Sequence, residues 1–198
     1  VLTLASSGML RGISLMITDG KPITKFGKEF MQLGIGRIGG FQLPLLFALA
    51  LILLAFPLMF HVKWGNYIRA LGGNEAALKR SGVQTGFYRI SVHMLLGITA
   101  AAAAVIITAR LNSAEPNAGM NMELDAITAV IMGGTPIRGG NASIAGTVLA
   151  VLILGSIRNG LTLLSVSSDF QQWITGFLLL ASVLISEIRV WNIKTLIK

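Results

Sequence analysis

LPLLFALALILLAFPLMF, the stretch at residues 43–60, contains no charged or hydrogen-bonding side chain over 18 residues. An α-helix rises about 1.5 Å per residue, so a helix of this length approaches the roughly 30 Å hydrocarbon core of a bilayer. Three further stretches are uncharged over 17 to 20 residues, at positions 90–109, 139–157 and 170–186. The sequence therefore predicts four membrane-spanning helices.

The composition agrees with a membrane protein. Of the 198 residues, 54% are apolar and 12% are charged, against roughly 25% charged in soluble domains, and the mean hydropathy is +0.75. The apolar fraction excludes a disordered chain, and the absence of cysteine excludes a disulfide scaffold and a thiolate metal site. The net charge is +8, but the charged residues lie between apolar runs, so we expect no nucleic-acid partner. We predict an all-α, polytopic transmembrane helical bundle that forms a single domain over residues 1–198.

Two weaker segments complete this scheme. Residues 1–18 are apolar but contain Arg11, and residues 126–137 would reach only about 18 Å as a helix. The second segment is therefore predicted to be a half-helix or a broken helix. The chain begins at Val1 without a signal-peptide pattern, so we expect it to be the C-terminal portion of a longer protein.

Basic residues predict the orientation of the spans. Residues 61–89 carry five lysines and arginines against the single acid Glu75, so this loop is predicted to be cytoplasmic. The tail is assigned to the same side by three basic residues, Arg189, Lys194 and Lys198. Residues 111–125 carry three acids and no base, as an external connection can.

Parity then assigns the remaining segments. An even number of crossings must separate the two cytoplasmic segments, so residues 126–137 and their glycine-rich flank are expected to return the chain across the membrane. The same scheme places residues 19–42 outside. Their four basic residues against two acidic ones do not favour that side.

A short helix is predicted within the 61–89 loop. Asn74 is a good N-cap, Glu75 places negative charge in the first turn, and Gly82 suits the left-handed position after the last turn. Such a helix is too short to be stable alone, so it is either an ordinary solvated connector or a segment that docks in a partner. The residues assigned to it as candidates for coupling are Asn74, Glu75, Ala76, Ala77, Arg80 and Gly82.

The second candidate site is a glycine-rich break. Asp125 is expected to cap the short helix before it, and Gly133, Gly134 and Pro136 are expected to end that helix. Irregular backbone at membrane depth is tolerated only beside protein or a water-filled cavity, and discontinuous helices often mark a translocation path. Alternatively, the paired glycines only allow two helices to approach closely. The predicted path residues are Gly133, Gly134, Gly139, Gly140 and Asn141.

These motifs resemble those of a transporter family. Glu75, Ala76, Ala77 and Gly82 look like the coupling helix of permease subunits in ATP-binding-cassette importers, which sits in a groove of the ATPase and transmits its closure. The string ELDAITAVIMGGTPIRGGNASIAGT at 123–147 is similar to the ribose-, xylose- and galactose-type permeases. The similarity runs from about residue 64 to residue 188. Arg138 and the triplet at 141–143 depart from the family pattern.

The resemblance implies a function and partners. The chain would be the permease that translocates a monosaccharide by alternating access in the bacterial cytoplasmic (inner) membrane. Implied partners are an ATP-binding subunit, a second permease copy, and a periplasmic or lipid-anchored sugar-binding protein. ATP hydrolysis would occur on the partner, with no cofactor on this chain. Candidate hydroxyl-binding residues, chosen by chemistry, are Asn121, Asn141, Asn159, Gln171 and Gln172.

Two alternatives remain open. The broken helix alone would also suit a secondary transporter or channel that works without an ATPase, and a structural membrane scaffold is a third possibility. Gly134 and Gly139 have the spacing of a P-loop, but Gly140 stands where its lysine should be, so ATP binding by this chain is not expected. Trp173 is predicted to be an interfacial anchor rather than a sugar-stacking face.

Overall fold

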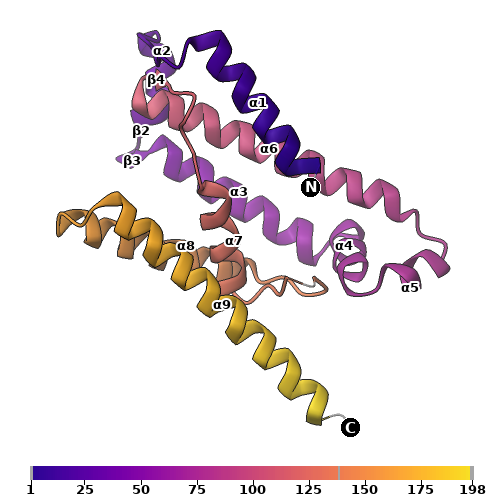
Figure 1. The fold of residues 1–198 in the computed structure, drawn as a ribbon. Helices are drawn as coiled ribbons and strands as arrows, with labels where there is room; N and C mark the ends of the chain where they lie inside the picture. Colours follow the sequence, from indigo (N-terminus) through magenta and orange to yellow (C-terminus); the bar gives the residue numbers. More distant parts are fainter. Residues whose placement is uncertain (1, 138, 197–198) are drawn as a thin grey trace. The chain divides into compact units, whose positions relative to one another are not determined.

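The computed structural model describes residues 2–137 and 139–196 and consists mainly of helices (Figure 1). The helices are α1 (Leu2–Thr18), α2 (Lys28–Ile35), α3 (Leu43–Phe60), α4 (Lys63–Gly73), α5 (Glu75–Arg80), α6 (Thr85–Leu111), α7 (Met122–Met132), α8 (Ile144–Leu163) and α9 (Ser168–Leu196). The strands have two residues each: β1 (Ile23–Thr24), β2 (Arg37–Ile38), β3 (Phe41–Gln42) and β4 (Ser113–Ala114). The all-α prediction is confirmed. Arg138 and Lys198 lie outside the described residues, as do the side chains of Arg189 and Lys194.

Four of the described helices, α3, α6, α8 and α9, are long and apolar enough to cross a membrane. At most 6% of the apolar window of any of them is buried within the protein. Such exposed apolar surface suits contact with lipid, because lipid tails are as apolar as these side chains. The four predicted spans are therefore confirmed, and the chain is a multi-pass membrane protein.

The helix boundaries follow the prediction where apolar composition alone decides them. Helix α3 occupies the predicted residues, whereas α6 continues beyond the predicted 90–109 at both ends, because charged side chains there do not prevent helix formation. Helix α8 begins at Ile144, so the start predicted at residue 139 is wrong. Gly139 and Gly140 have φ angles of +79° and +87°, which a right-handed helix excludes. Absence of charge does not distinguish such a loop from a helix.

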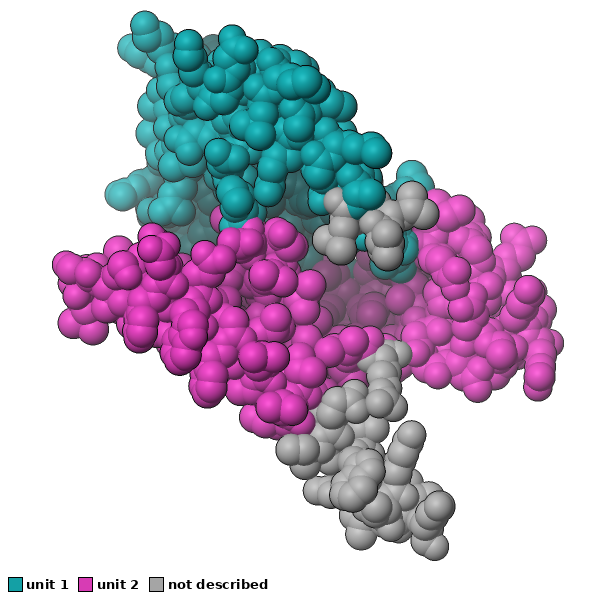
Figure 2. All heavy atoms as spheres, viewed as in Figure 1, with its two compact units in different colours: residues 1–54, 91–120 teal, residues 55–90, 121–198 magenta. Residues whose placement is uncertain are grey.

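The chain forms two compact units (Figure 2). Unit 1 comprises residues 1–54 and 91–120. Within it, β1 pairs antiparallel with β4, with Ile23 opposite Ala114. The backbone of Gly34 in α2 lies directly against that of Ala109 and Arg110 in α6. The 19–42 connection therefore packs on the end of α6 and on the connection that follows it.

Unit 2 comprises residues 55–90 and 121–198 and contains both predicted sites. Helix α7 packs against both α8 and α9, whereas α8 and α9 contact each other at few positions. Thr128, Ala129 and Ile131 of α7 are buried, and the Thr128 hydroxyl donates to the carbonyl of Leu124 at 2.7 Å. The short helix α7 is thus the centre of this part of unit 2.

Candidate functional site

Helix α5 has the local structure predicted for it. The Asn74 side-chain oxygen accepts a hydrogen bond from the backbone N–H of Ala77 at 3.0 Å, which caps the first turn. Gly82 adopts a φ of +79° directly after the C-cap residue Ser81. Leu78 is buried and anchors the helix, whereas the other five residues of α5 are exposed. The helix therefore exposes Glu75, Lys79 and Arg80 on its surface, and its docking role stays a prediction.

Glu75 has a partner that the sequence did not indicate. Its carboxylate accepts a hydrogen bond from the guanidinium of Arg89 at 2.6 Å, and the two side chains are 46% and 58% exposed. Arg89 belongs to the first turns of α6, so the ion pair joins α5 to the helix that follows. An exposed pair of this kind contributes about 0–1 kcal/mol. It positions the acidic end of α5 more than it stabilises the fold.

The residues before α5 touch the glycine-rich break. A Cβ placed on Gly72 would lie 2.7 Å from the backbone nitrogen of Gly140, and one on Gly139 would lie 2.9 Å from the Cα of Gly72. A Cβ on Gly140 would come within 3.2 Å of the Cα of Gly73. Two glycine pairs far apart in the sequence therefore place their backbones in direct contact. Because α5 begins two residues after Gly73, this contact connects the two predicted sites.

The break ends α7 as predicted. Gly133 is the C-cap, Gly134 has a φ of +91°, and the N–H groups of Gly134 and Thr135 donate to the carbonyls of Ile131 and Val130. This pair of bonds is a Schellman motif, which satisfies the last carbonyls of a helix. Nothing lies within 4 Å of a Cβ placed on Gly134, so a side chain there would not clash with a neighbouring backbone. Only the strain of its positive φ remains.

The loop then returns directly into α8. The backbone N–H of Ser143 donates to the Thr135 hydroxyl at 3.2 Å, and the Ser143 hydroxyl caps α8 by accepting from the N–H of Gly146 at 3.2 Å. Gly133 and Gly146 lie so close that a Cβ on either would meet the other segment's backbone. The alternative of close helix approach therefore applies to Gly133, at the junction of α7 and α8.

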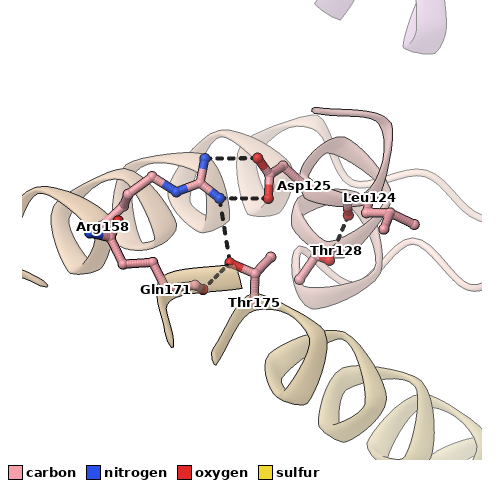
Figure 3. Close-up of polar contacts among 6 residues, drawn as sticks. All are labelled: Leu124, Asp125, Thr128, Arg158, Gln171 and Thr175. Atoms are coloured by element: carbon pink, nitrogen blue, oxygen red, sulfur yellow. Dashed lines mark hydrogen bonds and ion pairs between the residues drawn. The ribbon is translucent and has the colours of Figure 1, made fainter. Parts of the chain in front are cut away.

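Asp125 does not cap α7, and this prediction is wrong. The N-cap is Asn121, without a side-chain cap bond, and Asp125 lies one turn further on. The Asp125 carboxylate instead accepts two hydrogen bonds from Arg158 of α8, at 2.7 and 2.8 Å (Figure 3). Because α7 already begins at Met122, Asp125 lies inside the helix and not at the N-cap position, so its carboxylate is available for this strong bidentate pair. Sequence reasoning ended the third uncharged stretch at residue 157, one residue before Arg158, and missed the pair.

The ion pair belongs to a polar cluster formed by α7, α8 and α9. Arg158 also donates to the Thr175 hydroxyl at 3.4 Å, and Thr175 donates to the backbone carbonyl of Gln171 at 3.0 Å (Figure 3). The Gln171 amide donates to the Val166 carbonyl at 3.0 Å. This cluster lines a cavity of about 410 Å³ whose other walls include Leu154, Ile157, Leu161, Ile174 and Leu178.

A second cavity, of about 580 Å³, lies between α7, α9 and the break. Two predicted path residues, Gly134 and Asn141, line it together with Pro136 and Ser182. Leu178 lines both cavities. The path role of Gly134 and Asn141 stays a prediction, but the structure places both beside an open space.

The remaining polar candidates differ in position. Gln171 lines the first cavity, whereas Asn121, Asn159 and Gln172 line neither of the two cavities. Trp173 is 64% exposed and stacks between Phe170 and Phe177, with ring centroids 5.8 and 5.9 Å apart. Such an exposed aromatic face on a span suits an interfacial position better than a cavity wall.

Comparisons with known proteins match this chain to a family model and to curated relatives. A family model described as the branched-chain amino acid transport system permease component matches residues 3–183. The chain is 41% identical to the ribose import permease protein RbsC of Escherichia coli K12, over 94% of this chain and 60% of that protein. It is 35% identical to the D-allose transport system permease protein AlsC of the same strain, over 95% of this chain and 58% of that protein. It is 31% identical to the L-arabinose transport system permease protein AraH of that strain, over 96% of this chain and 58% of that protein.

The chain spans about three fifths of the length of these relatives. No solved structure matches it. The similarity to sugar-importer permeases that residues 123–147 predicted is confirmed, and it extends over most of the chain.

Proposed function

Because the chain belongs to the family of branched-chain amino acid transport system permease components, we propose that it is the membrane-spanning subunit of an ATP-binding-cassette importer for a monosaccharide. The names of three relatives, which are permeases for ribose, allose and arabinose, support a sugar rather than an amino acid as the substrate. The subunit does not hydrolyse ATP itself. Hydrolysis occurs on a separate ATP-binding subunit.

The observation that carries the proposal is the contact between the two glycines that precede α5, Gly72 and Gly73, and the glycine-rich break. The exposed residues of α5 offer a surface for a groove on the ATPase. Closure of the ATPase would move α5, and the backbone contact of Gly72 and Gly73 with Gly139 and Gly140 would pass that motion to the break. The break joins α7 to α8, and its residues line a cavity, so the motion reaches the proposed path.

The proposal includes an orientation in the bacterial inner membrane. Residues 61–89 form a coupling loop within one transmembrane domain of residues 1–198. The positive charge of this loop supports its position on the cytoplasmic side. The contact of Gly72 with Gly140 supports the same side for the break. The pairing of β1 with β4 supports a shared external side for residues 19–42 and 111–120, despite the basic residues of the first segment.

Three kinds of partner complete the importer. Two permease copies, identical in a homodimer, surround the path and contact membrane lipid. A periplasmic or lipid-anchored binding protein delivers the sugar to the external side, and the ATP-binding subunits receive α5.

The experiment is reconstitution of the full-length protein with its ATPase and binding protein in proteoliposomes. Uptake of D-ribose, D-allose, L-arabinose and L-leucine is measured with and without ATP. We expect uptake of a sugar that requires ATP and survives collapse of a proton gradient. Uptake driven by the gradient without ATP would establish the secondary-transporter alternative, and uptake of L-leucine alone would overturn the sugar assignment.

A further inference from the structure

We propose that the cavity bounded by Asp125, Arg158 and Thr175 is a binding site for a neutral polyhydroxylated molecule, a monosaccharide, on its route through the membrane. The inference deepens the proposed function and rests on it. Its ligand is defined by the chemistry of the cavity walls, which come from α7, α8 and α9 of unit 2.

The position of the ion pair calls for a functional reason. Arg158 lies inside the candidate span Ile144–Leu163, where a charged side chain is costly unless it has a partner. Asp125 neutralises it with two hydrogen bonds. A pair of apolar residues would hold these helices together at similar or lower free-energy cost. An ionisable pair within a candidate span therefore indicates a ligand or a path.

The cluster keeps hydrogen-bonding capacity for a ligand. A carboxylate has about four acceptor positions and a guanidinium has five donors, and the pair uses two of each between themselves. The Arg158 and Asp125 side chains are 49% and 28% exposed, so the unused positions are accessible. Donors and acceptors side by side suit hydroxyl groups, which both donate and accept.

The volume and the walls of the cavity suit a sugar ring. Its volume of about 410 Å³ is in the range of about 300–1,000 Å³ found for small-molecule sites. Leu154, Ile157 and Ile174 provide apolar wall for the C–H faces of a ring. The polar cluster then fixes the orientation through the hydroxyl groups.

The charges favour a neutral ligand over a zwitterion. The carboxylate and guanidinium cancel each other, so the cavity carries no net charge for an ionic ligand to match. The ammonium and carboxylate groups of an amino acid would each have to compete with the charged partner that Asp125 or Arg158 already has at 2.7–2.8 Å. A polyol adds hydrogen bonds without breaking the contacts at 2.7 and 2.8 Å.

The test measures protection of a cysteine in the cavity. Ile174→Cys places a thiol in the apolar wall without removing a member of the polar cluster. The full-length permease, made free of any other cysteine, is alkylated by N-ethylmaleimide in the presence of D-ribose, D-allose, L-arabinose or L-leucine. We expect one of the sugars, at about ten times its dissociation constant, to slow alkylation about tenfold. The matched control is Leu180→Cys on α9, 65% exposed and outside the cavity, where no sugar should protect.

A second variant keeps the test independent of folding. Asp125→Asn with Arg158→Gln removes both charges together and leaves no unpaired ion, so the helices should still assemble. In the Ile174→Cys background it should abolish protection while the yield of folded protein is retained. Absence of protection by all three sugars, protection by L-leucine instead, or unchanged protection in the double variant would each overturn the inference.

The transport assay separates this inference from the proposed function. ATP-dependent sugar uptake without protection at position 174 would leave the importer assignment standing and refute the cavity. Protection at position 174 without ATP-dependent uptake would support the cavity and refute the importer assignment.

Discussion

Gly139 combines two constraints that a side chain would violate. Its φ is +79°, and a Cβ would lie 2.9 Å from the Cα of Gly72. We predict that Gly139→Ala costs about 1–3 kcal/mol, because both the backbone strain and the contact must relax. The measurement is the amount of monodisperse protein after detergent extraction, together with its thermal midpoint.

Two other glycines separate these causes. Gly134 has a φ of +91° but open space around a Cβ, so Gly134→Ala should cost only the strain, about 1 kcal/mol. Gly176 lies in α9 with no positive φ and nothing within 4 Å, so Gly176→Ala should be neutral or stabilising. Equal losses at positions 134 and 139 would remove the contact with Gly72 from the explanation.

Glu75 is the residue at which an internal contact and a docking role must be told apart. Glu75→Arg would place two positive charges together at Arg89, and the loss of an exposed pair should change stability by about 1 kcal/mol or less. We predict that ATP-dependent transport nevertheless falls strongly, because in the proposed importer the exposed acidic end of α5 contacts the ATPase. The measurement is transport together with stimulated ATP hydrolysis in the reconstituted complex.

The control restores the ion pair in reverse. Glu75→Arg with Arg89→Glu returns a pair of opposite charges between α5 and α6. If Glu75 contacts the ATPase, transport stays low in this double variant. Recovery to the original rate would show that the internal pair with Arg89 is the whole role of Glu75.

At the scale of the element, α5 depends on its cap. It has six residues, and the side chain of Asn74 satisfies one of its first N–H groups. We predict that Asn74→Ala weakens the helix by about 0.5–2 kcal/mol and lowers coupled ATP hydrolysis, whereas Asn74→Asp retains both because aspartate caps equally well. Coupling that is the same in all three proteins would show that α5 is held by its flanks rather than by its cap.

The elements also show how far the sequence could predict this structure. Helix α3 was predicted to the residue because its apolar run ends where the helix ends, and α5 was predicted because its caps are local signals. The predictions for the start of α8 and for the role of Asp125 were wrong for a different reason. Arg158 is 33 residues from Asp125, and Gly72 meets Gly139 only through the fold, so no local pattern records either contact.

At the scale of the whole molecule, the two cavities of unit 2 lie near opposite ends of α7. The cavity at Asp125 and Arg158 lies toward the start of α7, and the cavity at Asn141 lies toward its end, with Leu178 lining both. In the proposed orientation the first cavity lies nearer the external side and the second nearer the cytoplasm. In an alternating-access cycle the sugar would pass from the first cavity to the second beside Leu178. The contact of the break with Gly72 would drive this change.

The orientation itself is testable with cysteines, because this sequence has none. We predict that Asn117→Cys and Lys25→Cys react with an impermeant thiol reagent in intact cells, since β1 pairs with β4 and the two connections share a side. Lys79→Cys and Ile137→Cys should react only after permeabilisation, because the contact of Gly72 with Gly140 keeps the break beside the coupling loop. Ile137 is 62% exposed, so poor access would not explain its protection. Labelling of position 79 in intact cells would reverse the topology, whereas labelling of position 137 alone would separate the break from the cytoplasmic side and remove the proposed route from α5 to the path.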